Sequence, residues 1–300
     1  MPLQILETQA KPFLKWAGGK GQLIDQIKEC LPKEFSITGK IEKYIEPFVG
    51  GGALFFWLSQ NFEIKEPYLY DINSEIITAY RTIKSKVYVL IDELEDLEKQ
   101  YLKLNDPGRE KFYYKKRTEY NHFIEKKIAN NVIKRTALLV FLNKTCFNGL
   151  FRVNSQGLYN VPFGRYENPT ICDEENLIAV NQALKNAEIE YRDFAYCLKV
   201  ADSDTFVYFD PPYRPISKTA NFTSYIKNGF DDAEQKRLKE TFVQLDQIGA
   251  KVMLSNSDPK DKFFDHLYRD YEIKRLTATR LINCDSSRRG LVKEVLITNY

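Results

Sequence analysis

The stretch TFVYFDPPYRPIS, residues 205–217, places an acid directly after a run that is typical of a buried strand. Asp210 follows five β-branched or aromatic residues, and Pro211 and Pro212 stiffen the chain behind it. Ligands of parallel sheets bind just beyond such carboxyl ends. A carboxylate held rigidly there is suited to accept hydrogen bonds from a ligand. An Asp-Pro pair can also do no more than end a strand, because proline lacks the N–H that a ladder needs.

A second candidate site lies in YIEPFVGGGAL, residues 44–54, where three glycines separate an expected strand from an expected helix. Such a loop turns tightly and leaves room for a ligand at the helix N-terminus, but its spacing is not that of a pyrophosphate loop. Asp71 ends the next expected strand about 20 residues on, the position from which an acid holds ribose hydroxyls. The pair indicates an adenosine-containing cofactor without a demanding phosphate site. A tight turn without a ligand is the alternative.

FLKWAGGKGQL, residues 13–23, sets Lys15, Trp16 and Lys20 around a Gly-Gly turn before the first expected helix. Lys20 can pair with a carboxylate, and Trp16 can pack against the apolar part of a ligand. The same residues also suit a plain N-terminal cap with an anchoring indole.

The charge of the chain is unevenly divided, although its net value is only +3. Residues 99–165 hold fourteen Lys and Arg against four acids, a net +10, and the remainder carries −7. Within this segment GLFRVNSQGLYNVPFGRY, residues 149–166, alternates around Ser155-Gln156-Gly157 and predicts a β-hairpin. A basic hairpin can enter a DNA groove, yet a run of charge by itself more often marks a solvated helix face.

The composition narrows the class of protein. Five cysteines form no CxxC pair and the two histidines lie far apart, which argues against a zinc site and fits free thiols in a reducing cytoplasm. The N-terminal residues lack a basic region followed by an apolar core, and no apolar run reaches membrane-spanning length. We therefore expect a soluble protein located in the cytoplasm.

The order of expected elements predicts one α/β sheet interrupted by a mostly helical insert. Strands are expected at 43–47, 68–71, 188–192, 206–210, 251–255, 272–277 and 293–298. Helices are expected at 20–30, 53–59, 73–84, 88–104, 111–141 and 233–247. The catalytic domain would comprise residues 1–86 and 188–300, and the insert residues 87–187.

Taken together, the ordered motifs resemble those of the Dam-type DNA N6-adenine methyltransferases (D12 class, group alpha), which methylate GATC. The motifs are LKWAGGK, EPFVGGGAL, YDIN, FNGLFRVN, NVPFGRY, FDPPY and MLSNS, and they run from residue 13 to residue 257. The resemblance implies a Rossmann-like sheet that binds S-adenosyl-L-methionine, and an insert that recognises DNA and contains the hairpin.

The resemblance also implies a mechanism. The lone pair of adenine N6 is delocalised into the ring, so the amino group is a poor nucleophile. Asp210 and the carbonyl of Pro211 would accept its two hydrogens, which rehybridises N6 and aims it at the methyl group. Pro212 would stiffen the turn, and Tyr213 would stack on an adenine flipped out of the duplex. No nucleophilic cysteine is needed.

Further roles follow residue by residue from the same resemblance. It assigns to the cofactor Trp16, Ala17, Gly18, Lys20, Glu46, Pro47, Phe48, Gly50, Gly52, Asp71, Ile72, Asp193, Phe194 and Asp210. It assigns to DNA Lys15, Asn148, Leu150, Arg152, Asn154, Pro162 and Tyr166, and the basic loop at Arg288 and Arg289 is expected to touch phosphates. Arg152 is the candidate for reading a guanine through O6 and N7; binding a phosphate is its alternative. Asn148 and Asn154 equally suit fixing the turn, and Asp193 and Phe194 equally suit an ordinary strand end.

Three other functions stay open at this point. The same acceptor geometry serves N4 of cytosine in DNA or N6 of adenine in RNA, and the scaffold also suits a catalytically silent DNA-binding protein. The sequence leaves undecided whether single-stranded DNA is a substrate, and whether a companion restriction endonuclease shares the target site.

Overall fold

The computed structural model describes residues 8–16, 20–126, 128, 130–214, 230–279 and 291–300. The chain divides into two compact units. The helical unit comprises Met1–Gly19, Gly50–Gln60 and Asn73–Lys185, and the sheet unit comprises Lys20–Val49, Asn61–Ile72 and Asn186–Tyr300. The predicted domain bounds, with an insert at 87–187, stay a prediction.

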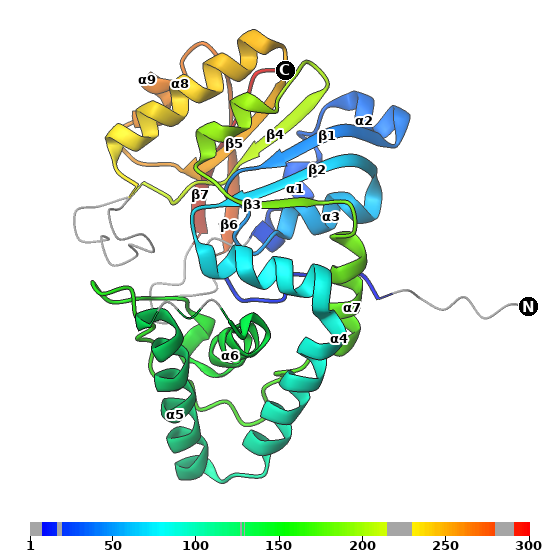
Figure 1. The fold of residues 1–300 in the computed structure, drawn as a ribbon. Coiled ribbons are helices and arrows are strands. Elements are labelled where there is room, and N and C mark those ends of the chain that lie inside the picture. Colours follow the sequence, from blue (N-terminus) through cyan, green and yellow to red (C-terminus); the bar gives the residue numbers. More distant parts are fainter. Residues whose placement is uncertain (1–7, 17–19, 127, 129, 215–229, 280–290) are drawn as a thin grey trace, which may run out of the picture. The chain divides into compact units, whose positions relative to one another are not determined.

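The sheet unit is built on seven strands in the order β3-β2-β1-β4-β5-β7-β6 (Figure 1). The strands are β1 (Lys40–Glu46), β2 (Glu63–Asp71), β3 (Glu188–Tyr191), β4 (Thr205–Phe209), β5 (Lys251–Ser257), β6 (Glu272–Thr279) and β7 (Leu291–Thr298). Strands β1 to β5 pair in parallel, whereas β7 runs antiparallel to both β5 and β6. The α/β class predicted from the sequence is confirmed, and each strand covers most of an expected run.

The order of the strands reverses between β1 and β4, which is where α/β sheets usually bind ligands. Ile45 of β1 is level with Val207 of β4, and Phe209 of β4 is level with Leu254 of β5. The carboxyl ends of these three strands therefore meet at one edge of the sheet. Asp210, the residue after β4, lies at this edge.

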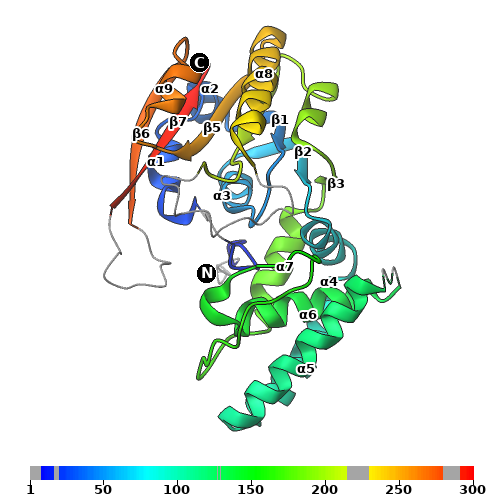
Figure 2. The ribbon, with the colours of Figure 1, turned by 90° about the vertical axis from the view of Figure 1, so that its left-hand side faces the viewer.

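Strand β4 is buried along its whole length, and its side chains alternate between two packed faces. Val207 and Phe209 belong to a core that includes Leu238 and Phe242 of α8 (Asp232–Ile248). Phe206 faces the other way, where it contacts the rings of Tyr44 and Phe35 among others. Figure 2 shows α8 running beside β5. The other helices of this unit are η1 (Lys20–Gln22), α1 (Ile24–Lys28), α2 (Lys33–Thr38), η3 (Phe194–Lys199) and α9 (Phe263–Leu267).

The helical unit contains longer helices, and its core is the apolar helix α6. Its helices are α3 (Ala53–Asn61, the last residue excepted), α4 (Ser74–Leu102), α5 (Asp106–Glu125), α6 (Val132–Thr145), η2 (Phe147–Gly149) and α7 (Glu174–Ala183). Helix α6 packs against both α4 and α5 and is buried from Thr136 to Asn143 (Figure 1). A helix covered on all sides is apolar all round, as its ALLVFL run is.

Two helix boundaries differ from the prediction. The runs expected at 73–84 and 88–104 form the single helix α4, which bends at Lys86 because that residue has φ −144° and ψ 34°. The run expected at 111–141 is two helices, α5 and α6. Helix α5 ends at Glu125, and α6 begins after Asn131, whose φ of 72° is left-handed and cannot continue a helix. Among the described residues no helix is both long and apolar enough to cross a membrane.

Candidate active site and DNA-reading segment

Asp210 is the acid at the end of β4, and its carboxylate meets a chain of hydroxyl groups. The hydroxyl of Ser255 donates to Oδ1 of Asp210 at 3.2 Å, and the Ser255 hydroxyl lies 2.9 Å from that of Tyr208. Both partners are buried. Side chains of β4 and β5 therefore hold Asp210 on the face of the sheet to which Phe206 and Tyr208 point.

Lys20 lies beside Asp210 and is itself buried, with 3% of its side chain exposed. Its Nζ is 2.7 Å from Oδ1 of Asp210 and 3.3 Å from Oε2 of Glu294 on β7. The Tyr213 hydroxyl accepts from Lys20 and donates to Glu294, and the ammonium lies 4.3 Å from the centre of the Tyr213 ring. Lys20, Asp210, Tyr213 and Glu294 thus form one cluster, which we name the acid–lysine cluster.

The charges of this cluster act on Asp210 in opposite directions. Burial raises the pKa of the Asp210 carboxyl, the nearby Lys20 ammonium lowers it, and the Glu294 carboxylate raises it again; the net direction is upward. Burial also raises the pKa of Tyr213 well above its usual value, with Asp210 and Glu294 adding to the effect. Tyr213 therefore stays a neutral phenol that can donate a hydrogen bond.

Two acids assigned to the cofactor end neighbouring strands of the sheet unit. Glu46, the last residue of β1, is buried and accepts a hydrogen bond of 2.8 Å from the Tyr44 hydroxyl. Asp71, the last residue of β2, is half-buried, and its carbonyl accepts from the N–H of Arg192. Pro47 follows Glu46, and Ile72, which follows Asp71, is 37% exposed.

Phe48 and Phe194, also assigned to the cofactor, stack on one another with their ring centres 5.4 Å apart. Asp193 precedes Phe194, and its carboxylate accepts two hydrogen bonds from Arg237, at 2.8 and 2.7 Å, and one from the N–H of Ala195. The Arg237 guanidinium holds the pKa of Asp193 below its usual value. The carboxylate therefore already has an ionic partner, and a ligand would have to share it.

The glycine loop belongs in part to the helical unit, where packing explains two of its glycines. A Cβ on Gly50, whose φ is +46°, would lie 2.9 Å from Cδ1 of Trp16. Gly52 has φ +68°, and the hydroxyl of Tyr80 occupies the place of its absent Cβ. These positions need glycine because a side chain would strain the backbone and collide with a ring. Ala17 and Gly18 lie outside the described residues.

Lys15 is an exposed residue whose backbone is tied to the segment predicted to read DNA. Its N–H donates to Oδ1 of Asn143 at 2.7 Å, and the amide of Asn143 donates to the carbonyls of Lys15 and Gly149 at 2.9 and 3.1 Å. The ammonium of Lys15 lies 4.9 Å from the centre of the Tyr166 ring. The buried Asn143, which the sequence did not single out, therefore joins two predicted DNA-binding segments.

Residues 149–166 form a short hairpin, in which the N–H of Asn154 donates to the carbonyl of Leu158 at 2.9 Å and the N–H of Asn160 to the carbonyl of Arg152 at 3.1 Å, without extended strands beyond it. The structure has isolated antiparallel bridges, Val153 to Tyr159 and Cys146 to Phe163. A tight turn covers residues 154–157, in which Gly157 has φ +81°. The side chain of Asn154 accepts from the N–H groups of Gln156 and Leu158 at 3.0 Å each. Asn154 thus fixes the turn, and Asn148 has a left-handed φ of 57° in its own turn.

The ladder of the hairpin goes no further because Pro162, which would donate next, has no N–H. Helix α5 covers the outer edge of the second arm, where its side chains bind backbone groups that face away from the first arm. Tyr113 and Arg117 donate to the carbonyl of Val161 at 2.8 and 3.1 Å. Asn121 binds both the N–H and the carbonyl of Tyr159, at 2.8 and 3.0 Å. These three residues are spaced i, i+4 and i+8, so they lie on one face of α5. The spacing is present in the sequence, but it is hard to recognise among the many charged residues of this helix.

Arg152 is exposed, and its guanidinium is held by one neighbour. Nε donates to the side chain of Asn160 at 2.8 Å, and a terminal nitrogen donates to the carbonyl of the same residue at 3.1 Å. Pro162 is exposed as well, whereas Leu150 is half-buried and its carbonyl accepts from the Tyr159 hydroxyl. Arg288 and Arg289 lie outside the described residues.

The sequence did not identify three candidate functional residues of the sheet unit: Glu294, Ser255 and Tyr208. Their partners in the cluster are 45 to 274 residues away along the chain. The motif MLSNS marks Ser255 as part of the resemblance, but nothing in LVKEVLI distinguishes Glu294 from an ordinary strand acid. Within the described part of the chain, no group of three or more His, Cys, Asp and Glu residues is placed to hold a metal ion.

An acid at the switch point of a mainly parallel sheet, followed by Pro-Pro-Tyr, defines a site of the amino-methylating kind. Residues 16–282 match the family of D12 class N6 adenine-specific DNA methyltransferases, and the chain belongs to this family. It is an adenine-specific DNA methyltransferase. Membership implies S-adenosylmethionine as methyl donor and DNA as substrate, and it sets aside the cytosine, RNA and silent-scaffold alternatives.

Several curated proteins are similar over nearly the whole chain. The type II methyltransferase M.MjaIII of Methanocaldococcus jannaschii is 49% identical over 97% of this chain and 100% of its own length. The type II methyltransferase M1.LlaDCHI of Lactococcus lactis subsp. cremoris is 38% identical over 99% and 98%. The DNA adenine methylase of Escherichia coli (strain K12) is 34% identical over 95% and 94%.

Proposed function

We propose that this chain methylates N6 of adenine within GATC in duplex DNA, and that the target base leaves the helix to reach Asp210. The observation that carries the proposal is Asp210 at the strand end, where Ser255 and Lys20 contact its carboxylate and 20% of its side chain stays exposed. A carboxylate in this place is an electrostatic partner fixed before the substrate arrives. The GATC assignment rests on the resemblance of FNGLFRVN and NVPFGRY to the reading segments of GATC methyltransferases.

In the proposed reaction the residues of the chain orient N6 and receive its proton. Asp210 accepts a hydrogen bond from the amino group, and the carbonyl of Pro211 accepts the second. Oε2 of Glu294 lies 3.3 Å from Nζ of Lys20. Glu294 therefore remains an ionic partner of the Lys20 ammonium when the target adenine displaces that ammonium from Asp210. The nitrogen gains a methyl group and loses one proton, for which Asp210 is the nearest base. Tyr213 packs against the face of the adenine.

The residues of the sheet unit suit the cofactor by their chemistry. S-adenosylmethionine supplies a methyl group made electrophilic by its sulfonium. The Asp71 carboxylate can accept hydrogen bonds from both ribose hydroxyls, and the aromatic pair of Phe48 and Phe194 offers a surface for a purine. Glu46, a buried acid at the end of β1, attracts a positively charged group. In the helical unit, Trp16, Gly50 and Gly52 are proposed for the methionine end.

Two exposed cations of the helical unit are proposed to read the bases. Arg152 is suited to donate two hydrogen bonds to O6 and N7 of a guanine, and Asn160 holds its guanidinium. Lys15 is proposed for a second base contact, and Leu150, Pro162 and Tyr166 for apolar contacts beside the recognised bases. The basic residues of 99–165 would supply the phosphate contacts that attract any DNA.

The decisive experiment presents the purified chain with labelled S-adenosylmethionine and two duplexes, one with GATC and one with the same bases scrambled. Label in N6-methyladenine is expected to be far greater in the GATC duplex than in the scrambled one. Equal label in both duplexes would refute the GATC assignment while leaving adenine methylation intact. A GATC-containing single strand in parallel tests whether a duplex is required.

We further propose that the chain protects DNA as the methyltransferase of a restriction–modification system. Support comes from the two relatives named type II methyltransferases, at 49% and 38% identity, against 34% for the adenine methylase of Escherichia coli. Deleting the gene in its native host tests this role. Loss of viability that is relieved by also deleting a neighbouring nuclease gene is expected, whereas a viable single deletion would favour a solitary role.

A further inference from the structure

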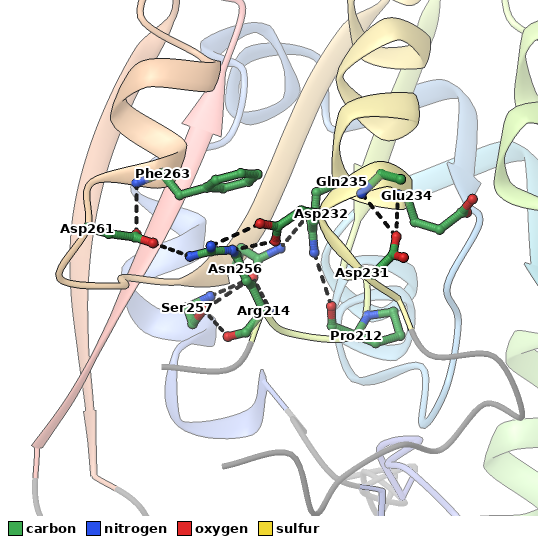
Figure 3. Close-up of polar contacts among 11 residues, drawn as sticks. Pro212, Arg214, Asp231, Asp232, Glu234, Gln235, Asn256, Ser257, Asp261 and Phe263 are labelled. Atoms are coloured by element: carbon green, nitrogen blue, oxygen red, sulfur yellow. Dashed lines mark hydrogen bonds and ion pairs between the residues drawn. The ribbon is translucent and has the colours of Figure 1, made fainter. Parts of the chain in front are cut away.

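Three polar side chains of the sheet unit lie beside Pro212 and Arg214 (Figure 3), and all three are buried. Gln235 of α8 and Asn256 of β5 are 0% exposed, and Ser257 of β5 is 1% exposed. Burying an amide or a hydroxyl is unfavourable unless it makes hydrogen bonds. Their partners therefore show what these residues are for.

All three bind the backbone that follows Asp210. Gln235 Nε2 donates to the carbonyl of Pro212 at 3.4 Å, and Asn256 Oδ1 accepts from the N–H of Arg214 at 3.2 Å. Ser257 Oγ donates to the carbonyl of Arg214 at 2.8 Å. We name Gln235, Asn256 and Ser257 the backbone clamp.

The register of the sheet explains why side chains make these bonds. Strand β4 ends at Phe209, level with Leu254, but β5 continues to Ser257. Pro211 and Pro212 have no N–H, so the chain beyond β4 cannot continue the ladder with β5. The clamp residues of β5 lie alongside this segment and supply the hydrogen bonds that the ladder lacks.

The amides of the clamp form a chain with a fixed direction. Asn256 Oδ1 accepts from Arg214 and also from the N–H of Ser257 at 2.9 Å, so Asn256 Nδ2 must point the other way, to Oε1 of Gln235 at 3.2 Å. This bond turns the amino group of Gln235 towards the carbonyl of Pro212. One amide therefore orients the next.

The side chain of Arg214 adds an outer anchor. It donates to both oxygens of Asp232, at 2.6 and 3.0 Å, and to Asp261 at 2.7 Å, and it lies 4.2 Å from the ring centre of Phe263 (Figure 3). The two acids are about half exposed, at 50% and 55%. These ion pairs hold the side chain of Arg214, whereas the clamp residues bind its backbone N–H and carbonyl directly.

We infer that Gln235, Asn256 and Ser257 are positioning residues for methyl transfer: by fixing the backbone of 212–214 they aim the Pro211 carbonyl and the Tyr213 ring at the target adenine. The inference rests on the proposed role of Asp210 to Tyr213. None of the clamp residues touches the base. Their effect is on geometry, and a displacement of about 1 Å in a reacting group can slow a reaction roughly 100-fold.

The variant Asn256→Asp tests the clamp with almost no change of shape. Asp keeps the acceptor for Arg214 but loses the donor to Gln235, so the Gln235 amide turns its amino group to the new carboxylate and leaves the Pro212 carbonyl. The measurement is the single-turnover rate of methyl transfer in a preformed complex with S-adenosylmethionine and duplex DNA. We expect a fall of about 10- to 100-fold, with the Kd for the cofactor changed less than about threefold.

A second pair of variants keeps the test decisive if Asn256→Asp folds poorly. Ser257→Ala removes the hydroxyl that holds Arg214, and Ser257→Thr restores it in a residue that suits a strand. The Thr variant should recover most of the rate lost in the Ala variant. Equal rates in the two would overturn the inference.

Thr241→Val is the matched control for stability. Thr241 is buried in α8, and its hydroxyl donates to the carbonyl of Arg237 at 3.1 Å, away from residues 212–214. It should lower Tm without slowing transfer. The inference fails if Asn256→Asp stays within twofold of the native rate, or if rate and Tm fall in proportion across all variants. A native chain that methylates no adenine would refute the proposed function instead.

Discussion

The acid–lysine cluster and the proposed DNA-reading segment, which comprises Lys15 and residues 148–166, hold their side chains in opposite ways. In the sheet unit, Lys20 and Asp210 are fixed by other side chains, among them Glu294, and Lys20 is only 3% exposed. In the helical unit, Lys15 and Arg152 are exposed, and the contacts that fix their segment run largely from side chains to backbone.

This difference matches what each region has to do. A charge that acts on a reacting nitrogen is most effective where water is excluded and the geometry is set in advance. A cation that reads a base edge must reach out of the protein, so it stays exposed and is held by few contacts, as Arg152 is by Asn160. The comparison predicts that changes in the cluster lower the rate on every DNA, whereas changes in the reading segment alter the choice of DNA.

The largest effect is expected from Asp210→Ala. Loss of one fixed electrostatic partner slows enzymes about 100- to 1,000-fold, and Asp210 is proposed also to receive the proton, so we expect at least that loss in the single-turnover rate. Cofactor binding should persist in part, since Glu46, Asp71 and Phe48 are unchanged. A rate within tenfold of the native value would refute the role of Asp210. Ala in place of the exposed acid Asp270 is the control.

The strand before Asp210 was predictable because it is buried on both faces. A central parallel strand has no solvent side, so TFVYF is apolar throughout and stands out in the sequence. Glu46 and Asp71 end strands that are buried mainly near their carboxyl ends, where the sequence shows the short runs YI and YLY. The local pattern of residues predicts where a strand lies in the sheet. That position in turn predicts which acids stand at the carboxyl ends of the strands.

The partners of these acids were not predictable from local pattern. Glu294 meets Lys20 across 274 residues of chain, and its burial does not distinguish it, because residues 294–298 are all buried. The hairpin is a second case. Its alternation predicted the turn, but not that Tyr113, Arg117 and Asn121 of α5 bind the outer backbone groups of its second arm. Both sets of contacts join residues that are far apart in the sequence.

The second effect is expected from Glu294→Gln, which removes a negative charge from the cluster with little change of shape. A hydrogen bond to a charged group contributes about 1.5–3 kcal/mol, so the maximal rate should fall roughly 10- to 150-fold on GATC and scrambled DNA alike.

The pH dependence of Glu294→Gln gives a sharper test. Asp210 can take the proton of N6, and offers a negative charge to the amino group, only when it is ionised, so activity is lost as the pH falls through its pKa. Glu294 raises that pKa, and Lys20 lowers it. Removing the Glu294 charge should therefore move the acid limb of the rate profile to lower pH. Glu272→Gln, at an exposed acid of β6, should leave the limb in place. A limb that moves to higher pH would contradict the assignment of the limb to Asp210.

The third effect, from Arg152→Ala, should appear in the choice of DNA. We expect a loss of about 1–3 kcal/mol of discrimination at one guanine of the site, measured as the ratio of kcat/KM on GATC to that on a duplex with this guanine replaced. Asn160→Ala should show part of the loss, because Asn160 holds the guanidinium. Lys115→Ala, at an exposed lysine of α5, should weaken all sequences alike. If Arg152→Ala does the same, Arg152 binds a phosphate.

The smallest effect is expected at Asn154, where two variants distinguish a residue that only fixes the turn from one that contacts a base. Asn154→Asp keeps the oxygen that accepts from Gln156 and Leu158, whereas Asn154→Ala removes it. If the residue only fixes the turn, the Asp variant should discriminate sequences as the native chain does. The Ala variant should lose about 0.5–1.5 kcal/mol, the usual contribution of one hydrogen bond, read as the same kcat/KM ratio. If the Asp variant loses discrimination as the Ala variant does, the Asn154 amide donates a hydrogen bond to a base. The side chain of Asn154 would then have two tasks, to fix the turn and to read DNA.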